Sequence, residues 1–145
     1  MDEEPGDGPS LILVGVDGSD TSMRAGAYAA GLARRQGSRL VALYVRGASA
    51  LSAAGAGAVG YIEEAQDTVA AELRQNLEGS SARLGIDATL EIREGNPFTE
   101  LMRLADERHP DAVVVGASMQ AGHRFIGSLA THLVRSARWP VIVVP

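Results

Sequence analysis

The chain has 145 residues, 46% of them hydrophobic, no cysteine and a formal net charge of -5. This length fits one globular domain that buries roughly two-thirds of its unfolded surface. The lack of cysteine excludes disulfides and thiolate metal sites, and the acidic balance argues against a nucleic acid as the principal partner, because that role needs a basic surface.

Residues 1–10 (MDEEPGDGPS) are acidic and have neither the positively charged start nor the apolar core of a secretory signal. We expect them to form a flexible tail in front of a single domain that spans residues 11–145. No later apolar run approaches the length that crosses a membrane. The sequence therefore predicts a cytoplasmic protein without a membrane partner.

The first predicted strand covers residues 11–16 (LILVGV), a continuous apolar run typical of a strand buried on both faces. The turn DGS at residues 17–19 ends it. Polar side chains at residues 19–22 can cap a helix that extends to about Arg35, where Gly37 stops it. The residues expected to face the core are Met23, Ala27, Ala30 and either Leu32 or Ala33.

A second apolar strand is predicted at residues 39–45 (RLVALYV). Residues 47–60, rich in glycine, alanine and serine, show no periodicity and are interpreted as a flexible insert. Residues 61–84 then form a long amphipathic helix, because apolar side chains recur at helical spacing. Its apolar stripe comprises Ile62, Ala65, Val69, Leu73 and Leu77.

The last half continues the alternation of strands and helices. Residues 87–94 (DATLEIRE) alternate between apolar and polar, as in a half-exposed edge strand. Asn96 and Pro97 begin a helix that runs to about His109. The remaining elements are a buried strand at 111–116 (DAVVVG), a glycine loop, a helix at about 128–137 and a final strand at 141–144.

Regular alternation with short connections predicts a parallel sheet with helices on both faces. Ligands of such sheets lie beyond the carboxyl ends of the strands. If the first strand neighbours the fourth, Asp17 and the loop after Gly116 share one crevice; the pattern alone leaves that strand order open. The final apolar strand, VIVV, would expose a sheet edge that can pair with another copy, so we expect a homodimer there.

Standard catalytic motifs are missing. The glycine spacing of residues 122–127 resembles a P-loop, but Ser128 stands where the lysine is required, and Asp17 is not flanked by GxGxxG. The histidines (His109, His123 and His132) lack metal-ligand spacing, and no GxSxG is present. We therefore predict no metal site and no enzyme, with slow nucleotide hydrolysis left open.

Polar groups around the expected crevice have two interpretations each. Asp17 could accept hydrogen bonds from a ribose or hold a cation, or it could cap the turn that begins the next helix. Gly127 and Ser128 could donate to a phosphate, or Ser128 could be an N-cap. His123 and Arg124 could add positive charge or be solvated.

Several segments together resemble the universal stress protein family, and the likeness covers nearly the whole chain. They are VGVDGSDTSMRAGAYAA, LVALYV, VVVGASMQAGHRFIGSLATHLVR and RWPVIVVP. The resemblance implies an α/β fold, a doubly wound five-stranded parallel sheet of the flavodoxin or Rossmann-like kind with strand order 3-2-1-4-5. It also implies a homodimer formed through the last strand.

The resemblance also implies an adenine-nucleotide site, because some family members bind ATP or AMP, with Mg²⁺ when the ligand is ATP. The positions that match the family's binding residues are Gly15, Val16, Asp17, Val45, Gly116, Gly127, Ser128 and Leu129. Met119 replaces the loop's second glycine, and Gly127 comes two positions early. The shortened loop favours AMP or a smaller anion over ATP, because fewer backbone donors remain. Other family members bind no nucleotide, so a dimeric protein-interaction scaffold is the alternative.

Overall fold

One parallel sheet organises the chain, and the computed structural model describes residues 10–47, 55, 57–117 and 127–145. The sheet has five strands in the order β3-β2-β1-β4-β5, as predicted, and every adjacent pair is parallel. The strands are β1 (Leu11–Gly15), β2 (Arg39–Arg46), β3 (Ala88–Glu94), β4 (Ala112–Gly116) and β5 (Val141–Val144). The helices are α1 (Asp20–Gln36), α3 (Val59–Leu84), α4 (Pro97–Arg108) and α5 (Ser128–Ser136).

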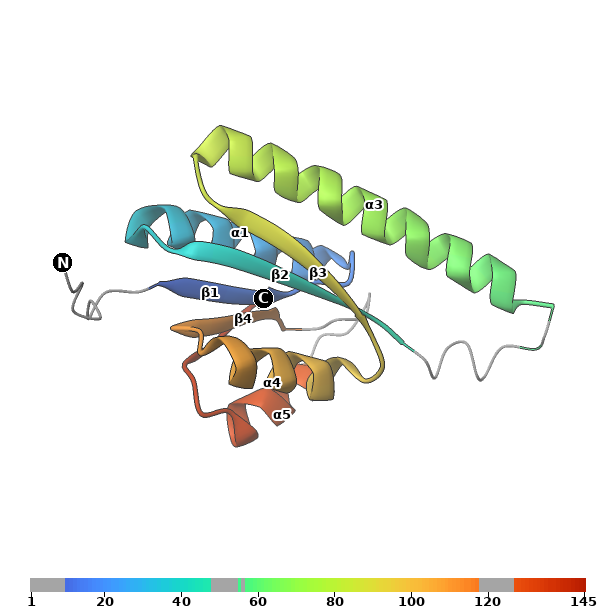
Figure 1. Ribbon diagram of the computed structural model, residues 1–145. Coiled ribbons are helices and arrows are strands. Elements are labelled where there is room, and N and C mark those ends of the chain that lie inside the picture. Colours follow the sequence, from blue (N-terminus) through green and yellow to red (C-terminus); the bar gives the residue numbers. More distant parts are fainter. Residues whose placement is uncertain (1–9, 48–54, 56, 118–126) are drawn as a thin grey trace.

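The helices form two layers around the sheet. Helices α1 and α3 lie on one face and α4 and α5 on the other (Figure 1). Side chains from alternate positions of the central strands therefore form two cores. Ile12 and Val14 pack on the α1 side, and Leu11, Leu13 and Val115 pack toward α4 and α5. This double burial explains why β1 and β4 are apolar throughout.

Helix α1 has the local signals that the sequence predicts. The Ser19 hydroxyl accepts a hydrogen bond from the Ser22 N–H at 3.4 Å, and Gly37 ends the helix with a φ of 67°. Of the residues predicted to face the core, Ala30 and Ala33 are buried and Met23 packs against the core, but Ala27 is exposed. Ala25, Ala29, Ala30 and Ala33 are buried with Ser22. Alanine occurs around most of this helix, so packing partners rather than periodicity select the buried face.

Helix α3 begins at Val59, inside the predicted insert, and extends well beyond the sheet (Figure 1). Because its first half projects past β3, Ala65 is exposed rather than part of the core as predicted. Leu73 is the one buried residue of this fully described helix. Residues 48–54 and 56 of the insert and residues 1–9 of the predicted tail lie outside the described residues.

Candidate functional site

Strands β1 and β4 end near the same level of the sheet, and β2 continues past them to Arg46. Gly15 of β1 is paired with Leu43 of β2, and Val14 is paired with Val114 of β4. Extending both registers by a few residues sets Asp17 beside Val45 on one side and beside Ala117 on the other. Neighbouring strands lie about 4.8 Å apart. The order β2-β1-β4 therefore brings these predicted site positions to one edge, which the sequence pattern alone left open.

Gly116 at the end of β4 lies directly against the first turn of α1. A Cβ built on Gly116 would lie 2.6 Å from the Thr21 Oγ1 atom, 2.7 Å from the Thr21 carbonyl carbon and 2.9 Å from the Ser22 nitrogen. Real Cβ atoms do not approach other atoms so closely. Glycine is therefore required here by close backbone approach and not by a positive φ, since Gly116 is not among the glycines with positive φ.

The residues that flank the glycine loop between β4 and α5 are hydrogen-bonded to each other. The Gly127 N–H donates to the Ala117 carbonyl, and the Ala117 N–H donates to the Val144 carbonyl at 2.7 Å. Ala117 and Gly127, the described residues on either side of the loop, are therefore neighbours beside the ends of β4 and β5. Residues 118–126, which include Met119, His123 and Arg124, lie outside the described residues, and so do the predictions made for them.

Asp17 is half-buried in the turn between β1 and α1. Its Oδ1 atom accepts a hydrogen bond from the Ser19 N–H at 2.9 Å, and its own N–H donates to the Ser22 hydroxyl at 3.2 Å. The turn-capping role is therefore present. The bond that closes the turn uses Oδ1, the carboxylate oxygen that faces Ser19.

Helix α5 begins at Ser128, with Gly127 as its N-cap residue. The alternative that Ser128 is the N-cap is therefore wrong, because Ser128 is already the first helical residue. No side chain caps this helix start, and its first turn carries no acidic residue. By contrast, the starts of α1 and α4 are capped by Ser19 and Asn96. The first N–H groups of α5 are of the kind that bind anions.

Arg46 is a site neighbour that the sequence analysis missed. It follows Val45 at the end of β2, and its guanidinium forms a salt bridge with Asp67 of α3 at 2.8 Å and contacts the Gln66 side chain at 3.3 Å. These bonds fasten the projecting half of α3 to the edge of the sheet that carries Asp17. Its position directly after Val45 was the only sequence signal for this role.

The pKa of the Tyr44 phenol is shifted by burial and by the charged side chains around this edge. Burial raises its pKa, and the carboxylates of Asp17 and Asp67 raise it further, while Arg46 lowers it. Tyr44 is 6% exposed. It therefore stays a neutral phenol near neutral pH and is not a candidate nucleophile.

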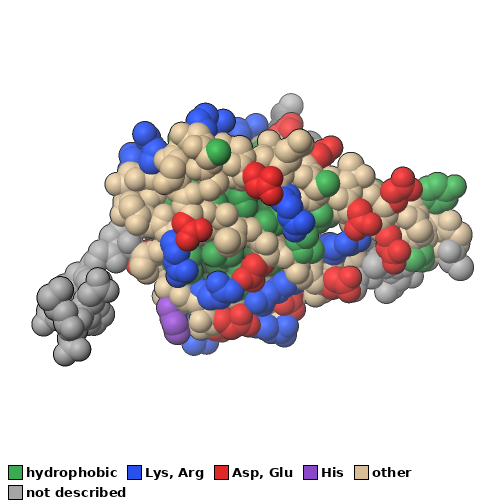
Figure 2. Space-filling view, turned by 45° about the horizontal axis from the view of Figure 1, so that its top comes forward, with side chains coloured by type: hydrophobic (Ala, Val, Ile, Leu, Met, Phe, Trp, Pro, Cys, Tyr) green, Lys and Arg blue, Asp and Glu red, His purple; other side chains and the backbone are tan. Residues whose placement is uncertain are grey.

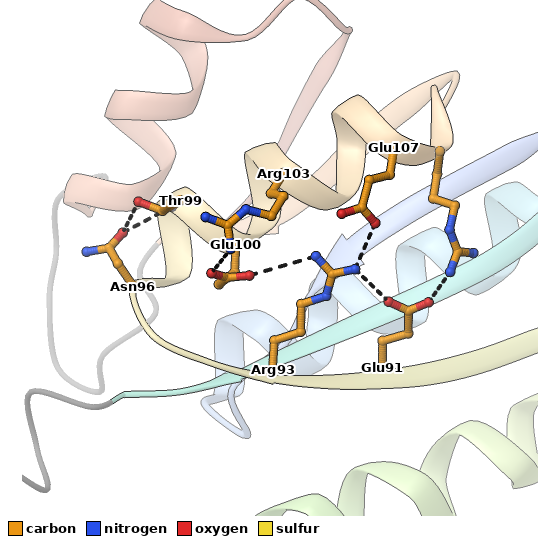
Figure 3. Close-up of polar contacts among 8 residues, drawn as sticks. Glu91, Arg93, Asn96, Thr99, Glu100, Arg103 and Glu107 are labelled. Atoms are coloured by element: carbon orange, nitrogen blue, oxygen red, sulfur yellow. Dashed lines mark hydrogen bonds and ion pairs between the residues drawn. The ribbon is translucent and has the colours of Figure 1, made fainter.

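A second polar cluster lies between β3 and α4 (Figure 3), and its Arg93 is paired in register with Val45 of β2. Arg93 reaches three carboxylates, those of Glu107 at 2.9 Å, Glu91 at 3.5 Å and Glu100 at 3.7 Å. Arg108 also pairs with Glu91. Opposite charges are matched within the cluster, so it holds the edge strand to α4 and leaves no charge for a ligand.

Replacing Arg93 by glutamine is expected to lower the free energy of unfolding by about 1–2 kcal/mol at pH 7, because several charged hydrogen bonds are lost at a side chain that is 23% exposed. The matched control is Arg103→Gln. Arg103 contacts only Glu100 in this cluster and is 58% exposed, so its loss should cost less than about 0.5 kcal/mol. Urea denaturation measures both values, and equal losses would contradict the assignment.

The stability gap between the original protein and Arg93→Gln should narrow below about pH 4. The hydrogen bond from Arg93 lowers the pKa of Glu107. A carboxyl with a lowered pKa stabilises the fold above its ordinary pKa, and this contribution is lost as the pH falls through the folded-state value. Arg93, whose pKa is raised, stays charged throughout. Denaturation at pH 7 and pH 3 checks this, and a constant gap would refute it.

Within residues 10–47, 55, 57–117 and 127–145, no group of three or more His, Cys, Asp or Glu side chains could hold a metal ion. None of the described helices combines the length and the apolar character needed to cross a membrane.

Residues 10–145 match the model of the universal stress protein family. Among curated proteins, a universal stress protein of Methanocaldococcus jannaschii is 27% identical over 136 residues, which cover 92% of this chain and 80% of that protein. One of Bacillus subtilis is 27% identical over 143 residues, covering 92% and 97%. Both relatives match 92% of this chain.

Solved structures agree with these relatives. The universal stress protein UspA from Lactobacillus plantarum is 28% identical with a TM-score of 0.80, and the match covers 97% of this chain and 100% of that one. Two more distant structures hold nucleotides. A universal stress protein in complex with cAMP is 24% identical, with a TM-score of 0.63 and coverage of 95% and 98%. One from Archaeoglobus fulgidus in complex with dAMP is 22% identical, with a TM-score of 0.63 and coverage of 94% and 98%. At these identities the last two likenesses concern the fold.

Proposed function

The chain belongs to the universal stress protein family, and from this premise we propose that it is a dimeric module that binds an adenine nucleotide. The site is the edge where β1, β2 and β4 end. The observation that carries the proposal is the register of β1 and β4, which on extension sets Asp17 beside Ala117 at this edge. The hydrogen bond between Gly127 and Ala117 brings the helix start there.

The chemistry of this edge suits a nucleoside monophosphate. The carboxylate of Asp17 can accept hydrogen bonds from ribose hydroxyls. The N–H groups of Ser128 and Leu129, at the uncapped start of α5, can donate to phosphate oxygens. The half-buried Val45 offers apolar contact to a base, whereas the Val16 side chain is buried in the core on the α1 side, so that Val16 contributes only its backbone position. Gly15 and Gly116 keep the backbone of the neighbouring strands close. AMP fits this set better than ATP, because a triphosphate and its Mg²⁺ need more donors than the short loop provides.

The structural neighbours support this choice of ligand. The two complexes described above hold cAMP and dAMP, and both ligands are adenine nucleotides with a single phosphate. We propose binding rather than turnover for this chain, because no described side chain near Asp17 is placed to activate water. A cytoplasmic location, expected from the sequence, belongs to the same proposal.

A thermal-shift titration with AMP, ATP and cAMP, each with and without Mg²⁺, tests the proposal. A ligand that binds only the folded state raises the melting temperature, and at a hundredfold its Kd it adds about 2.7 kcal/mol. AMP should give the largest shift, and Mg²⁺ should change the AMP shift little. If millimolar nucleotide leaves the melting temperature unchanged, the scaffold alternative is favoured.

Replacing Asp17 by alanine should weaken AMP binding at least about tenfold, because charged hydrogen bonds to the ribose are lost. Asp17→Asn keeps an oxygen for the Ser19 N–H and so separates loss of charge from loss of the turn. Asp20→Asn is the control, since Asp20 is an exposed residue of the first turn of α1. Calorimetric titration measures all three, and an unchanged Kd in Asp17→Ala would contradict the role of this carboxylate.

A further inference from the structure

The first half of α3 contacts the elements of the proposed site at two places. Val69 lies against the turn that carries Asp17, because a Cβ built on Gly18 would lie 3.2 Å from the Val69 Cγ1 atom. Arg46, the last residue of β2, bonds to the helix closer to its start. The turn after β1 and the end of β2 are thus both joined to one helix.

Each of the guanidinium nitrogens of Arg46 contacts α3. Nη1 forms the salt bridge with Asp67 at 2.8 Å, Nε donates to the Gln66 side chain at 3.3 Å, and Nη2 donates to the Glu63 carbonyl at 3.3 Å. The backbone of Arg46 is fixed as well, since its carbonyl accepts a hydrogen bond from the Gly95 N–H at 2.9 Å. The Arg46 side chain is 18% exposed, so water screens its contacts less than those of an exposed pair.

Acidic side chains gather on the projecting half of α3, at the right of Figure 2. They include Glu63, Glu64 and Asp67. Their charge opposes an anionic ligand at the neighbouring edge of the sheet. The carboxylates of Asp67 and Asp17 both raise the pKa of Tyr44, so both act on the same part of the molecule. Arg46 is the cation between α3 and the strand ends, and it lowers that pKa.

On the basis of the proposed function, we infer that Arg46 is a positioning residue for the nucleotide site and couples this site to the first half of α3. A nucleotide that contacts Asp17 and Val45 needs the turn after β1 and the end of β2 in fixed positions. Both segments contact α3, so the nucleotide binds more tightly while α3 lies against them. By linkage, a bound nucleotide then holds the first half of α3 in place.

Asp67→Ala is the variant that tests the inference, because charge and position predict opposite changes in affinity. Removing a negative charge near a phosphate ligand should by itself tighten binding. Loss of the bridge to Arg46 should instead weaken AMP binding at least about fivefold, as measured by calorimetric titration. Glu64→Ala is the matched control. It removes an exposed carboxylate from the same half of α3, and its Kd for AMP should stay the same or fall slightly.

Backbone amide exchange gives a second measurement that a purely structural role would not change. AMP should slow the exchange of residues 62–69 in the original protein and in Glu64→Ala. It should have little effect on this segment in Asp67→Ala or in Arg46→Gln, which breaks the bridge from the other end. Without ligand, both bridge variants should exchange faster here than the original protein.

Two results would overturn this inference alone. One is an Asp67→Ala variant that binds AMP as tightly as the original protein. The other is AMP that binds the original protein but leaves the exchange of residues 62–69 unchanged. If millimolar AMP does not bind the original protein, the proposed function is wrong and this inference is wrong with it.

Discussion

Replacing Gly116 by alanine is expected to destabilise the protein by about 2 kcal/mol or more. The added Cβ would lie 2.7 Å from the Thr21 carbonyl carbon and 2.9 Å from the Ser22 nitrogen, and backbone atoms cannot move aside as a flexible side chain can. Overpacking of this kind costs about 1–3 kcal/mol. Either the end of β4 or the first turn of α1 must shift, so AMP binding should weaken as well.

Gly15→Ala is the matched control for this prediction. Gly15 ends the neighbouring strand β1, yet a Cβ there would lie 3.6 Å from its nearest neighbours, side-chain carbons of Leu101 and Val115, which is an ordinary contact. Its effect should stay within about 1 kcal/mol. Urea denaturation of both variants measures the difference. Equal stabilities would mean that α1 and β4 separate easily, which would contradict a requirement for the close approach of Gly116 to Thr21 and Ser22.

Val143→Pro is expected to convert the proposed dimer into a monomer. The carbonyls of Pro140 and Val144 accept hydrogen bonds from β4, and Ile142 is paired with Val114. Backbone groups alternate in direction along a strand, so the N–H of Val143 faces the free edge of the sheet. Proline removes that donor but leaves the bonds to β4, as it does in natural edge strands.

The control is Val143→Ile, which keeps the N–H and a β-branched side chain. Light scattering should give the mass of two chains for the original protein and Val143→Ile, and of one chain for Val143→Pro. Removing the whole tail after Trp139 is a poorer test, because β4 would lose its partner strand as well. A dimeric Val143→Pro variant would refute pairing through this edge.

Local signals account for the parts of the fold that the sequence predicted well. The starts of α1 and α4 follow from Ser19 and Asn96, and the end of α1 follows from Gly37. Each acts on its own turn, so no knowledge of distant residues is needed. The unbroken apolar runs of β1 and β4 likewise predict strands covered on both faces.

Contacts between distant segments explain what the sequence could not predict. The exposed Ala27 shows that an alanine-rich helix gives no unique buried face until its neighbours are placed. The approach of Gly116 to Thr21 and the bridge from Arg46 to Asp67 also join separate elements. No local pattern encodes either contact. The strand order came from the family resemblance and not from periodicity.

The site was predicted in outline. The positions chosen on β1, β2 and β4 end at one edge of the sheet, and Ser128 opens α5. That these residues hold a nucleotide stays a prediction. Spacing alone could not show which oxygen of Asp17 is already used by the turn, because that depends on the path of the backbone to Ser19.

The most direct test of the nucleotide site is a backbone NMR titration of the full chain with AMP. If AMP binds at the proposed site, we expect saturable amide shifts that centre on Asp17, Val45, Gly116 and residues 127–129. These shifts should disappear in Asp17→Ala. No shift at millimolar AMP, or saturable shifts that centre elsewhere on the molecule, would contradict it.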